Sequence, residues 1–231
     1  MTTTLPCIET TSGPNPSAAV IWLHGLGADG NDFAAIVPEL DLTGCAPIRF
    51  VFPHAPSMPV TLNGGYVMPA WYDILGTETQ RREDEAGIRR SALAIEALIQ
   101  RELDRGIDAG KIVLAGFSQG CAMVLYTGLR YPARLAGIMA LSGYLPLADT
   151  LMAERSPANL QVPIFMAHGV SDPMIVLPRA VASRDALASM GYPVQWHQYP
   201  MQHSLHPREI EDIGHFLRAV VGADGQAAEP H

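Results

Sequence analysis

Residues 111–125 are KIVLAGFSQGCAMVL, and this stretch sets the fold class that the rest of the sequence predicts. Its apolar start, residues 111–115, carries Ile and Val and follows a glycine, which is typical of a buried parallel strand. The apolar run at residues 121–131 stops before Pro132, which predicts a helix that ends there. Ser118 is therefore expected on the turn between a strand and a helix.

The residues around Ser118 suit a tight and strained turn. Gly116 and Gly120 flank it, at positions where only small residues let one backbone segment approach another. Such a turn lifts the serine hydroxyl above the sheet edge and directs the free N–H groups of the helix N-terminus at the group under attack. The pattern G-x-S-x-G between a strand and a helix therefore predicts a nucleophilic serine.

Length and composition predict one large domain. The chain has 231 residues, of which 48% are apolar and 16% are charged, so it can bury a sizeable core and is too apolar for disorder. We expect a single domain over residues 1–221 and a flexible tail, rich in Gly and Ala, over residues 222–231. The net charge of −8 is spread along the chain, which argues against nucleic acid and anionic membranes as partners.

The cysteines and the N-terminal residues point to a protein of the cytoplasm. Cys7, Cys45 and Cys121 are odd in number, far apart and without C-x-x-C spacing. They predict neither a disulfide framework nor a zinc site, and no metal is expected. Residues 1–16 lack the basic start and apolar core of a signal peptide, and no apolar run reaches the length of a membrane span. A soluble cytoplasmic protein is expected.

Predicted strands alternate with predicted helices over most of the chain. The strands are expected at residues 18–23, 48–52, 111–115, 135–141, 163–167 and 194–199, and the helices at residues 31–40 (with Asn31 as the cap), 84–105, 121–131, 178–190 and 207–221. This alternation predicts an α/β fold with a doubly wound, mostly parallel sheet flanked by helices. The proline- and glycine-marked residues 57–77 are expected to form a long loop, which inside a compact domain is more often functional than idle.

Two side chains later in the chain can complete the chemistry of Ser118. A serine hydroxyl is a poor nucleophile at neutral pH and needs a base within hydrogen-bond reach and a group that orients the base. Asp172 and His203 both follow predicted strands, and the order Ser, Asp, His is the one expected of this turn. His203 would pass the serine proton to the leaving group while Asp172 fixes its tautomer. Asp149 and Asp185 are weaker alternatives because both lie in helix-like stretches.

Other histidines compete with His203 for the role of base. His206 directly precedes Pro207 at a predicted helix start, where a surface or capping role is commoner. His24 and His168 each end a strand before a glycine, and this repetition suggests backbone packing rather than proton transfer. His203 is therefore the predicted base.

The oxyanion of an acyl-transfer reaction needs two preorganised N–H donors. One is expected from Gln119, the residue after the nucleophile, and the other from Leu26, because the glycines at residues 24–27 let its backbone turn inwards. The alternative is that these glycines mark only a tight turn. Apolar residues on the long loop could line an acyl pocket or serve only in packing: Leu62, Met68, Trp71 and Tyr72.

Six motifs, in this order, resemble a known family over nearly the whole chain. They are HGLGADGNDF at residues 24–33, FPHAP at 52–56, AWYDI at 70–74, GFSQG at 116–120, HGVSDP at 168–173 and MQH at 201–203. The sequence is similar to the bacterial carboxylesterase and acyl-protein thioesterase family. The resemblance implies an α/β-hydrolase fold, no cofactor, and hydrolysis of carboxylic esters or thioesters with short to medium acyl groups. It places the family's triad on Ser118, Asp172 and His203 and its oxyanion donors on Leu26 and Gln119, and it allows a homodimer.

Two residues depart from the family's pattern. Cys121 follows the strand–helix turn where the family commonly has glycine, and Gln202 precedes the predicted catalytic histidine where the family also commonly has glycine. Neither change removes a catalytic group, so both bear on the substrate range.

These observations lead us to expect a serine carboxylesterase that hydrolyses small-molecule esters of short to medium chain through an acyl-enzyme on Ser118. The alternative within enzymes is an acyl-protein thioesterase or lysophospholipase that acts on long-chain thioesters or lysophospholipids. The rival from another class is a binding protein that keeps the fold without the activity.

Overall fold

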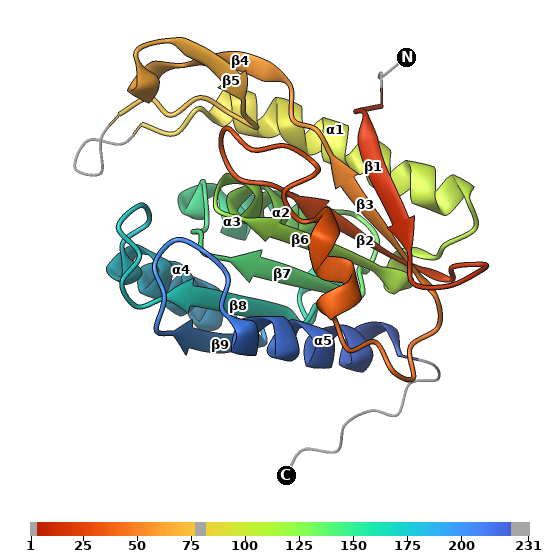
Figure 1. Ribbon diagram of the computed structural model, residues 1–231. Coiled ribbons are helices and arrows are strands. Elements are labelled where there is room, and N and C mark those ends of the chain that lie inside the picture. The colour runs from red at the N-terminus through yellow and green to blue at the C-terminus, as the bar shows by residue number, and fades with distance from the viewer. Residues whose placement is uncertain (1–3, 77–81, 223–231) are drawn as a thin grey trace.

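A seven-stranded sheet forms the centre of the computed structural model, which describes residues 4–76 and 82–222 (Figure 1). The strands lie in the order β1-β3-β2-β6-β7-β8-β9, and every neighbouring pair is parallel except β1 and β3. Their bounds are Cys7–Thr11 for β1, Ala18–Leu23 for β2, Ile48–Pro53 for β3, Ile112–Phe117 for β6, Gly137–Leu141 for β7, Ile164–Gly169 for β8 and Val194–Tyr199 for β9. The predicted doubly wound, mostly parallel sheet is confirmed.

Helices cover both faces of this sheet. Their bounds are Glu85–Asp104 for α1, Gln119–Arg130 for α2, Ala148–Glu154 for α3, Leu177–Ser189 for α4 and Pro207–Val221 for α5, with 3-10 helices at Ala34–Glu39 (η1), Thr61–Asn63 (η2), Ala109–Lys111 (η3) and Pro157–Asn159 (η4). Helices α1, α2 and α4 bury residues such as Ile95, Leu125 and Leu187 in one apolar cluster. On the other face η1 and α5 bury Ile36 and Phe216 in a second cluster, and both lie in front of the sheet in Figure 1.

The register of the central strands brings their carboxyl ends level with one another. All six residues of β2 are buried, as expected of a parallel strand covered on both faces. Leu23 at the end of β2 lies opposite Gly116 of β6, and Phe117 of β6 lies opposite Leu141 of β7. The loops that leave these strands therefore meet at one edge of the sheet.

The predicted helix at residues 31–40 is wrong in type and in cap. A 3-10 helix, η1, forms instead, and its N-cap is Phe33. Asn31 belongs to the preceding turn, where its backbone N–H and its side-chain amide both donate to Asp29 Oδ1. Pro38 lies inside η1 and has no N–H to donate to the carbonyl four residues earlier, so an α-helix cannot continue there.

The predicted long loop at residues 57–77 is wrong over most of its length. Residues Ser57–Val60 (β4) and Tyr66–Pro69 (β5) pair as an antiparallel hairpin, on the side of the molecule toward which the parallel strands run in Figure 1. Gly64 and Gly65 make its turn with positive φ angles of 66° and 80°. Pro59 and the short strands hid the hairpin from the sequence pattern. Residue 77 lies outside the described residues.

Strand β1 had no counterpart in the sequence prediction. It pairs only with β3, as an antiparallel edge strand, and its residues are partly buried or exposed. An edge strand with one neighbour needs no continuous apolar run, so Cys7–Thr11 carries a weak signal.

The predicted flexible tail lies outside the described residues except for Gly222, which forms an isolated antiparallel bridge with Cys45. Within the described ranges, no helix has both the length and the apolar character needed to cross a membrane.

Candidate active site

Ser118 occupies a strained turn between β6 and α2. Its φ of 56° and ψ of −115° are rare for a residue with a side chain. A Cβ on Gly116 would overlap the carbonyl of Gly120, and a Cβ on Gly120 would overlap the carbonyl of Leu23. The Ser118 N–H donates to the Leu141 oxygen at 2.9 Å, which ties the turn to β7. The two glycines are thus required for the turn to close.

His203 joins Ser118 to Asp172 through two hydrogen bonds. His203 Nε2 lies 2.9 Å from Ser118 Oγ, and His203 Nδ1 lies 2.6 Å from Asp172 Oδ2. The Asp172 side chain is fully buried, and its other oxygen accepts the N–H groups of Met174 and Ile175 at 2.8 and 3.0 Å. The loops after β8 and β9 therefore bring the predicted acid and base to the serine in a chain that can relay a proton.

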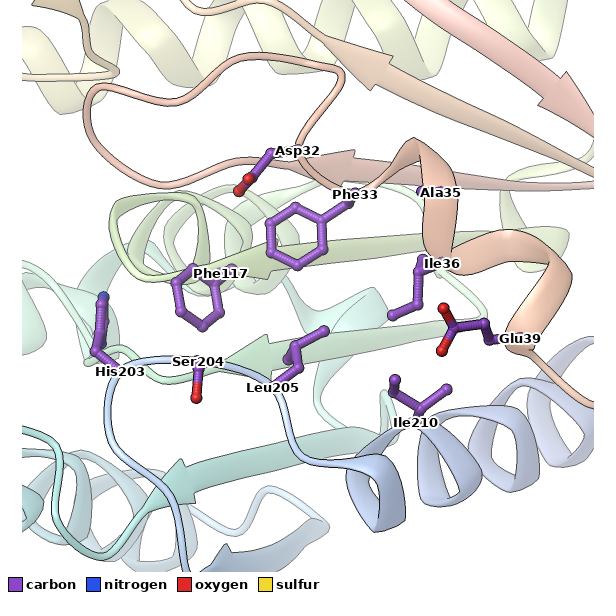
Figure 2. Close-up of a pocket in the computed structure, with 10 residues that line it drawn as sticks. All are labelled: Asp32, Phe33, Ala35, Ile36, Glu39, Phe117, His203, Ser204, Leu205 and Ile210. Carbon is purple, nitrogen blue, oxygen red and sulfur yellow. The ribbon is translucent and has the colours of Figure 1, made fainter.

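The His203 ring lies against the first of two tilted aromatic rings. Its centroid lies 4.7 Å from the ring of Phe117, whose own centroid lies 5.5 Å from that of Phe33 on the turn before η1. Figure 2 shows these rings at an open depression of about 390 Å³. The depression is lined by Asp32, Phe33, Ala35, Ile36, Glu39, Phe117, His203, Ser204, Leu205 and Ile210. His203 thus lines this depression, whereas Ser118 does not.

His24 and His168 serve the backbone around the site. His24 is buried, and its Nε2 accepts the N–H of Ala55 at 3.1 Å. His168 is also buried, and its Nε2 lies 2.8 Å from the oxygen of Ile175. Burial lowers the pKa of both imidazoles, so both are neutral at neutral pH. These contacts agree with the backbone-packing role expected for the pair.

The remaining alternatives are a helix cap and two exposed helical residues. His206 is the N-cap of α5, and its Nδ1 accepts the N–H of Arg208 at 3.2 Å, which confirms the capping role. Asp149 is exposed in α3, and Asp185 is exposed in α4, where it pairs with Arg184.

Leu26 and Gln119 stand where the sequence predicts oxyanion donors. Leu26 belongs to the loop after β2, and Gln119 is the first residue of α2. Both line one cavity together with Ser118. Neither backbone N–H donates to another group within the described part of the chain, so both can serve a substrate. Their role as donors stays a prediction.

A cavity of about 570 Å³ opens at Ser118 and is lined mainly by apolar residues. Its lining consists of Gly25, Leu26, Ala28, Asp32, Leu62, Asn63, Met68, Tyr72, Ile74, Gly76, Phe117, Ser118, Gln119, Tyr144, Pro173, Met174, Ile175 and His203. Leu62, Met68 and Tyr72, which were candidates for a pocket lining, thus line the cavity. Trp71 does not: it is 1% exposed and donates through Nε1 to the His24 oxygen at 2.9 Å. Its side chain faces the core because that carbonyl needs a buried donor.

The sequence analysis missed several residues that line this cavity. Tyr144 follows β7, and its hydroxyl lies 2.8 Å from that of Tyr72. Met174 and Ile175 follow Asp172 in the loop after β8. Each stands just beyond the carboxyl end of a parallel strand, and that position was the signal that could have identified them.

Cys121 and Gln202, the two departures from the family's pattern, lie outside the cavity. Cys121 is fully buried beneath the turn, where its Sγ lies 2.5 Å from the place a Cβ on Gly143 would take. Burial raises the pKa of its thiol, which therefore stays protonated. Gln202 is exposed. Cys7, Cys45 and Cys121 are free thiols, and the described ranges hold no group of three or more His, Cys, Asp or Glu side chains placed to bind a metal.

A serine on a strand–helix turn, hydrogen-bonded to a histidine that is held by a buried aspartate above a mostly parallel sheet, defines a serine hydrolase of the α/β-hydrolase class. The chain belongs to the phospholipase/carboxylesterase family, whose model matches residues 5–221.

Relatives of this chain carry a more specific name. Acyl-protein thioesterase 1 of Neurospora crassa is 44% identical over 216 residues, which cover 87% of this chain and 86% of the relative. Acyl-protein thioesterase 1 of Yarrowia lipolytica is 38% identical over 217 residues, with 92% and 96% covered. The crystal structure of Zea mays acyl-protein thioesterase 2 superposes with a TM-score of 0.80 at 28% identity and covers 93% of this chain and 99% of its own.

These relatives correct two expectations. The resemblance was assigned to a bacterial family, whereas the two curated relatives above are fungal. The interpretation as a short- to medium-chain carboxylesterase is wrong, since the relatives are named acyl-protein thioesterases, which was the alternative. The motifs did not separate the two because they carry the acyl-transfer machinery, which esters and thioesters share.

Proposed function

We propose that this chain is an acyl-protein thioesterase, which hydrolyses the thioester between a fatty acyl group and a protein cysteine. The observation that carries the proposal is the 44% identity to acyl-protein thioesterase 1 of Neurospora crassa over 87% of this chain. The apolar cavity at Ser118 supports it, because an acyl chain needs an apolar channel that opens at the nucleophile.

The first half of the reaction forms an acyl-enzyme on Ser118. His203 Nε2 takes the hydroxyl proton as Ser118 Oγ attacks the thioester carbonyl, and Asp172 stabilises the imidazolium that results. The carbonyl π electrons move to its oxygen, which the N–H groups of Leu26 and Gln119 would hold. As the carbonyl reforms, the carbon–sulfur bond breaks, and His203 gives its proton to the departing thiolate.

The second half releases the fatty acid. His203 removes a proton from a water molecule, whose oxygen attacks the acyl ester on Ser118. The same two N–H groups hold the second oxyanion, and the proton returns from His203 to Ser118 Oγ when the ester bond breaks. The products are the free protein thiol, the carboxylic acid and the unchanged enzyme.

The thiol leaves from the cavity at Ser118, which His203 also lines, so the base can protonate it there. The depression of about 390 Å³ adjoins His203 but is not lined by Ser118 (Figure 2).

The wider setting of the enzyme is also part of this proposal. Three free cysteines support a reducing compartment, and we place the activity in the cytoplasm. A single domain over residues 1–221 and a homodimer, which the resemblance allows, stay predictions; gel filtration with light scattering of the full chain measures the assembly.

The proposal is tested with three substrates: an S-palmitoyl peptide, a p-nitrophenyl ester series from acetate to palmitate, and a lysophospholipid. We expect the highest kcat/KM on the S-palmitoyl peptide, and a loss of roughly 10⁴-fold or more in kcat for Ser118→Ala. Ser189→Ala, an exposed serine at the end of α4, is the matched control and should keep full activity. Turnover of the p-nitrophenyl esters or the lysophospholipid without turnover of the thioester would contradict the thioesterase proposal.

A further inference from the structure

Residues 69–72 bond to both loops that carry the proposed oxyanion donors. On one side the Gly27 N–H donates to the Pro69 oxygen, and Trp71 Nε1–H donates to the His24 oxygen, each at 2.9 Å. These bonds hold the 24–27 loop on either side of Leu26.

The same residues are also bonded to the first residue of α2. The Trp71 N–H donates to Gln119 Oε1 at 2.8 Å, and Gln119 Nε2 donates to the Tyr72 oxygen at 2.6 Å. The Gln119 side chain is therefore bound at both its oxygen and its nitrogen. Its backbone N–H donates to no group in the described ranges, and the residue lines the cavity.

These bonds lie in the interior, where a lost partner is costly. Trp71 is 1% exposed and Gln119 is 4% exposed. The Trp71 oxygen accepts the hydroxyl of Ser91 on α1, and the ring of Trp71 lies 5.3 Å from that of His24. Leaving a buried polar group unpaired is costly, so these bonds favour the observed position of residues 69–72.

We propose that residues 69–72 act as a splint that sets the separation of the Leu26 and Gln119 N–H groups, and that Trp71 and the Gln119 side chain are positioning residues. The inference rests on the proposed function only through the oxyanion, which esters and thioesters form alike. It assigns a role to the motif AWYDI that the catalytic groups leave unexplained.

The splint also connects the oxyanion hole, which the N–H groups of Leu26 and Gln119 would form, to the cavity that would hold the acyl chain. Tyr72, at one end of the splint, and Met68, directly before the other end, line that cavity, and the Tyr72 hydroxyl lies 2.8 Å from the hydroxyl of Tyr144. An acyl chain seated against these side chains therefore bears on the segment that aligns the donors.

The main variant is Trp71→Phe, which keeps an aromatic ring and the backbone N–H but removes the Nε1–H bond to His24. We expect kcat to fall by up to about 100-fold on both p-nitrophenyl esters and S-acyl peptides, since misplacement of a catalytic group by about 1 Å costs about that much. KM should change by less than about threefold, because the ground state does not use the hole.

The matched control is Trp22→Phe. Trp22 is also 1% exposed, but its Nε1 has no partner within the described residues, so its replacement removes no hydrogen bond. It should leave kcat unchanged. A second variant, Gln119→Glu, keeps the acceptor for Trp71 but sets a carboxylate oxygen against the Tyr72 carbonyl, and it should lower kcat as Trp71→Phe does.

Inhibitor binding separates positioning from a general loss of structure. An alkyl trifluoromethyl ketone is attacked by Ser118 Oγ, whose proton passes to His203, and its carbonyl electrons form an oxyanion in the hole. An alkyl thioether of the same chain length fills the cavity without one. Trp71→Phe should lower the affinity for the ketone by the same factor as it lowers kcat/KM, and it should leave the affinity for the thioether unchanged.

The positioning role of residues 69–72 would be contradicted if the affinities for the ketone and the thioether fell equally. It would also be contradicted if both variants bound the ketone as tightly as wild type. The outcome is separate from that of the proposed function. If the wild-type enzyme hydrolyses p-nitrophenyl esters but no S-acyl peptide, the thioesterase proposal is wrong. The effect of the splint variants on kcat can still be measured with the esters.

Discussion

Two buried carboxyl groups, those of Asp172 and Glu209, differ in the partners that the fold provides. Asp172 has His203 and two backbone N–H groups around it. Glu209, in the first turn of α5, accepts only the N–H of His206, at 3.3 Å, and its Oε1 is buried without a partner among the described residues. Burial raises the pKa of Glu209 to about 8. Glu209 is therefore a carboxyl group that the fold favours in its protonated form.

This difference predicts a pH effect on stability. The folded state binds the Glu209 proton more tightly than the unfolded state, so the free energy of unfolding falls as pH rises from the unfolded pKa toward about 8. The loss approaches about 1.4 kcal/mol per pH unit in that window. Glu209→Gln cannot ionise, so its stability relative to wild type should rise between about pH 5.5 and pH 8 in urea unfolding. Glu211→Gln, exposed on the same helix, should not show this rise.

The strand–helix turn depends on two backbone approaches that leave no room for a side chain. The Gly116 Cα faces the Gly120 carbonyl, and the Gly120 Cα faces the carbonyls of Leu23 and His24. Both the serine and the first oxyanion loop thus depend on the same contact between β6, α2 and β2. A change there affects stability and activity together.

Gly120→Ala tests this contact. The added methyl would overlap backbone atoms that cannot rotate away, so we expect a loss of about 1–3 kcal/mol in the free energy of unfolding and a fall in kcat. Gly110→Ala in η3 is the control, because a Cβ there meets nothing within 4 Å. Urea unfolding and ester hydrolysis measure both effects, and a Gly120→Ala enzyme as stable and active as the Gly110→Ala enzyme would contradict the close approach.

An ion cluster attaches α1 to the edge of the sheet. Glu102 of α1 is fully buried, and its two oxygens lie 2.7 Å from Arg49 Nη1 of β3 and 3.0 Å from Arg105 Nη1. Glu9 of β1 lies 3.0 Å from the same Arg105 nitrogen. The cluster thus joins the antiparallel edge strand, its neighbour and the longest helix.

Removing the buried charge should loosen that attachment. Glu102→Gln leaves Arg49 and Arg105 facing a neutral amide, and we expect a loss of about 3 kcal/mol in the free energy of unfolding. Glu85→Gln breaks an exposed pair with Arg89 in the same helix and should cost less than about 1 kcal/mol. Equal costs for the two variants in urea unfolding would contradict a structural role for the cluster. Ester hydrolysis should be nearly unchanged, because Glu102 is no part of the site.

Part of the fold and site followed from local patterns. The runs that became β2, β6 and β7 are apolar and bounded by turn residues, so their positions were predictable. Ser118, Asp172 and His203 were predictable as candidates because each stands directly after a strand, and parallel strands end at one edge. The structure brings the three together, and their roles are part of the proposed function.

Contacts between distant residues decided the rest. Trp71 looked like a pocket residue, but it packs inward because the carbonyl of His24 and the side chain of Gln119, 48 residues away, accept its two N–H groups. The cavity wall at Tyr144 likewise depends on a contact with Tyr72, 72 residues earlier, that no short window of sequence contains. The sequence by itself determined the parallel strands of the sheet, the serine turn and the candidate partners, because these follow from short-range propensity and strand order. Only the tertiary structure decided which side chains line the cavity and which hold the backbone, because buried polar groups take the partners that the assembled fold brings within reach.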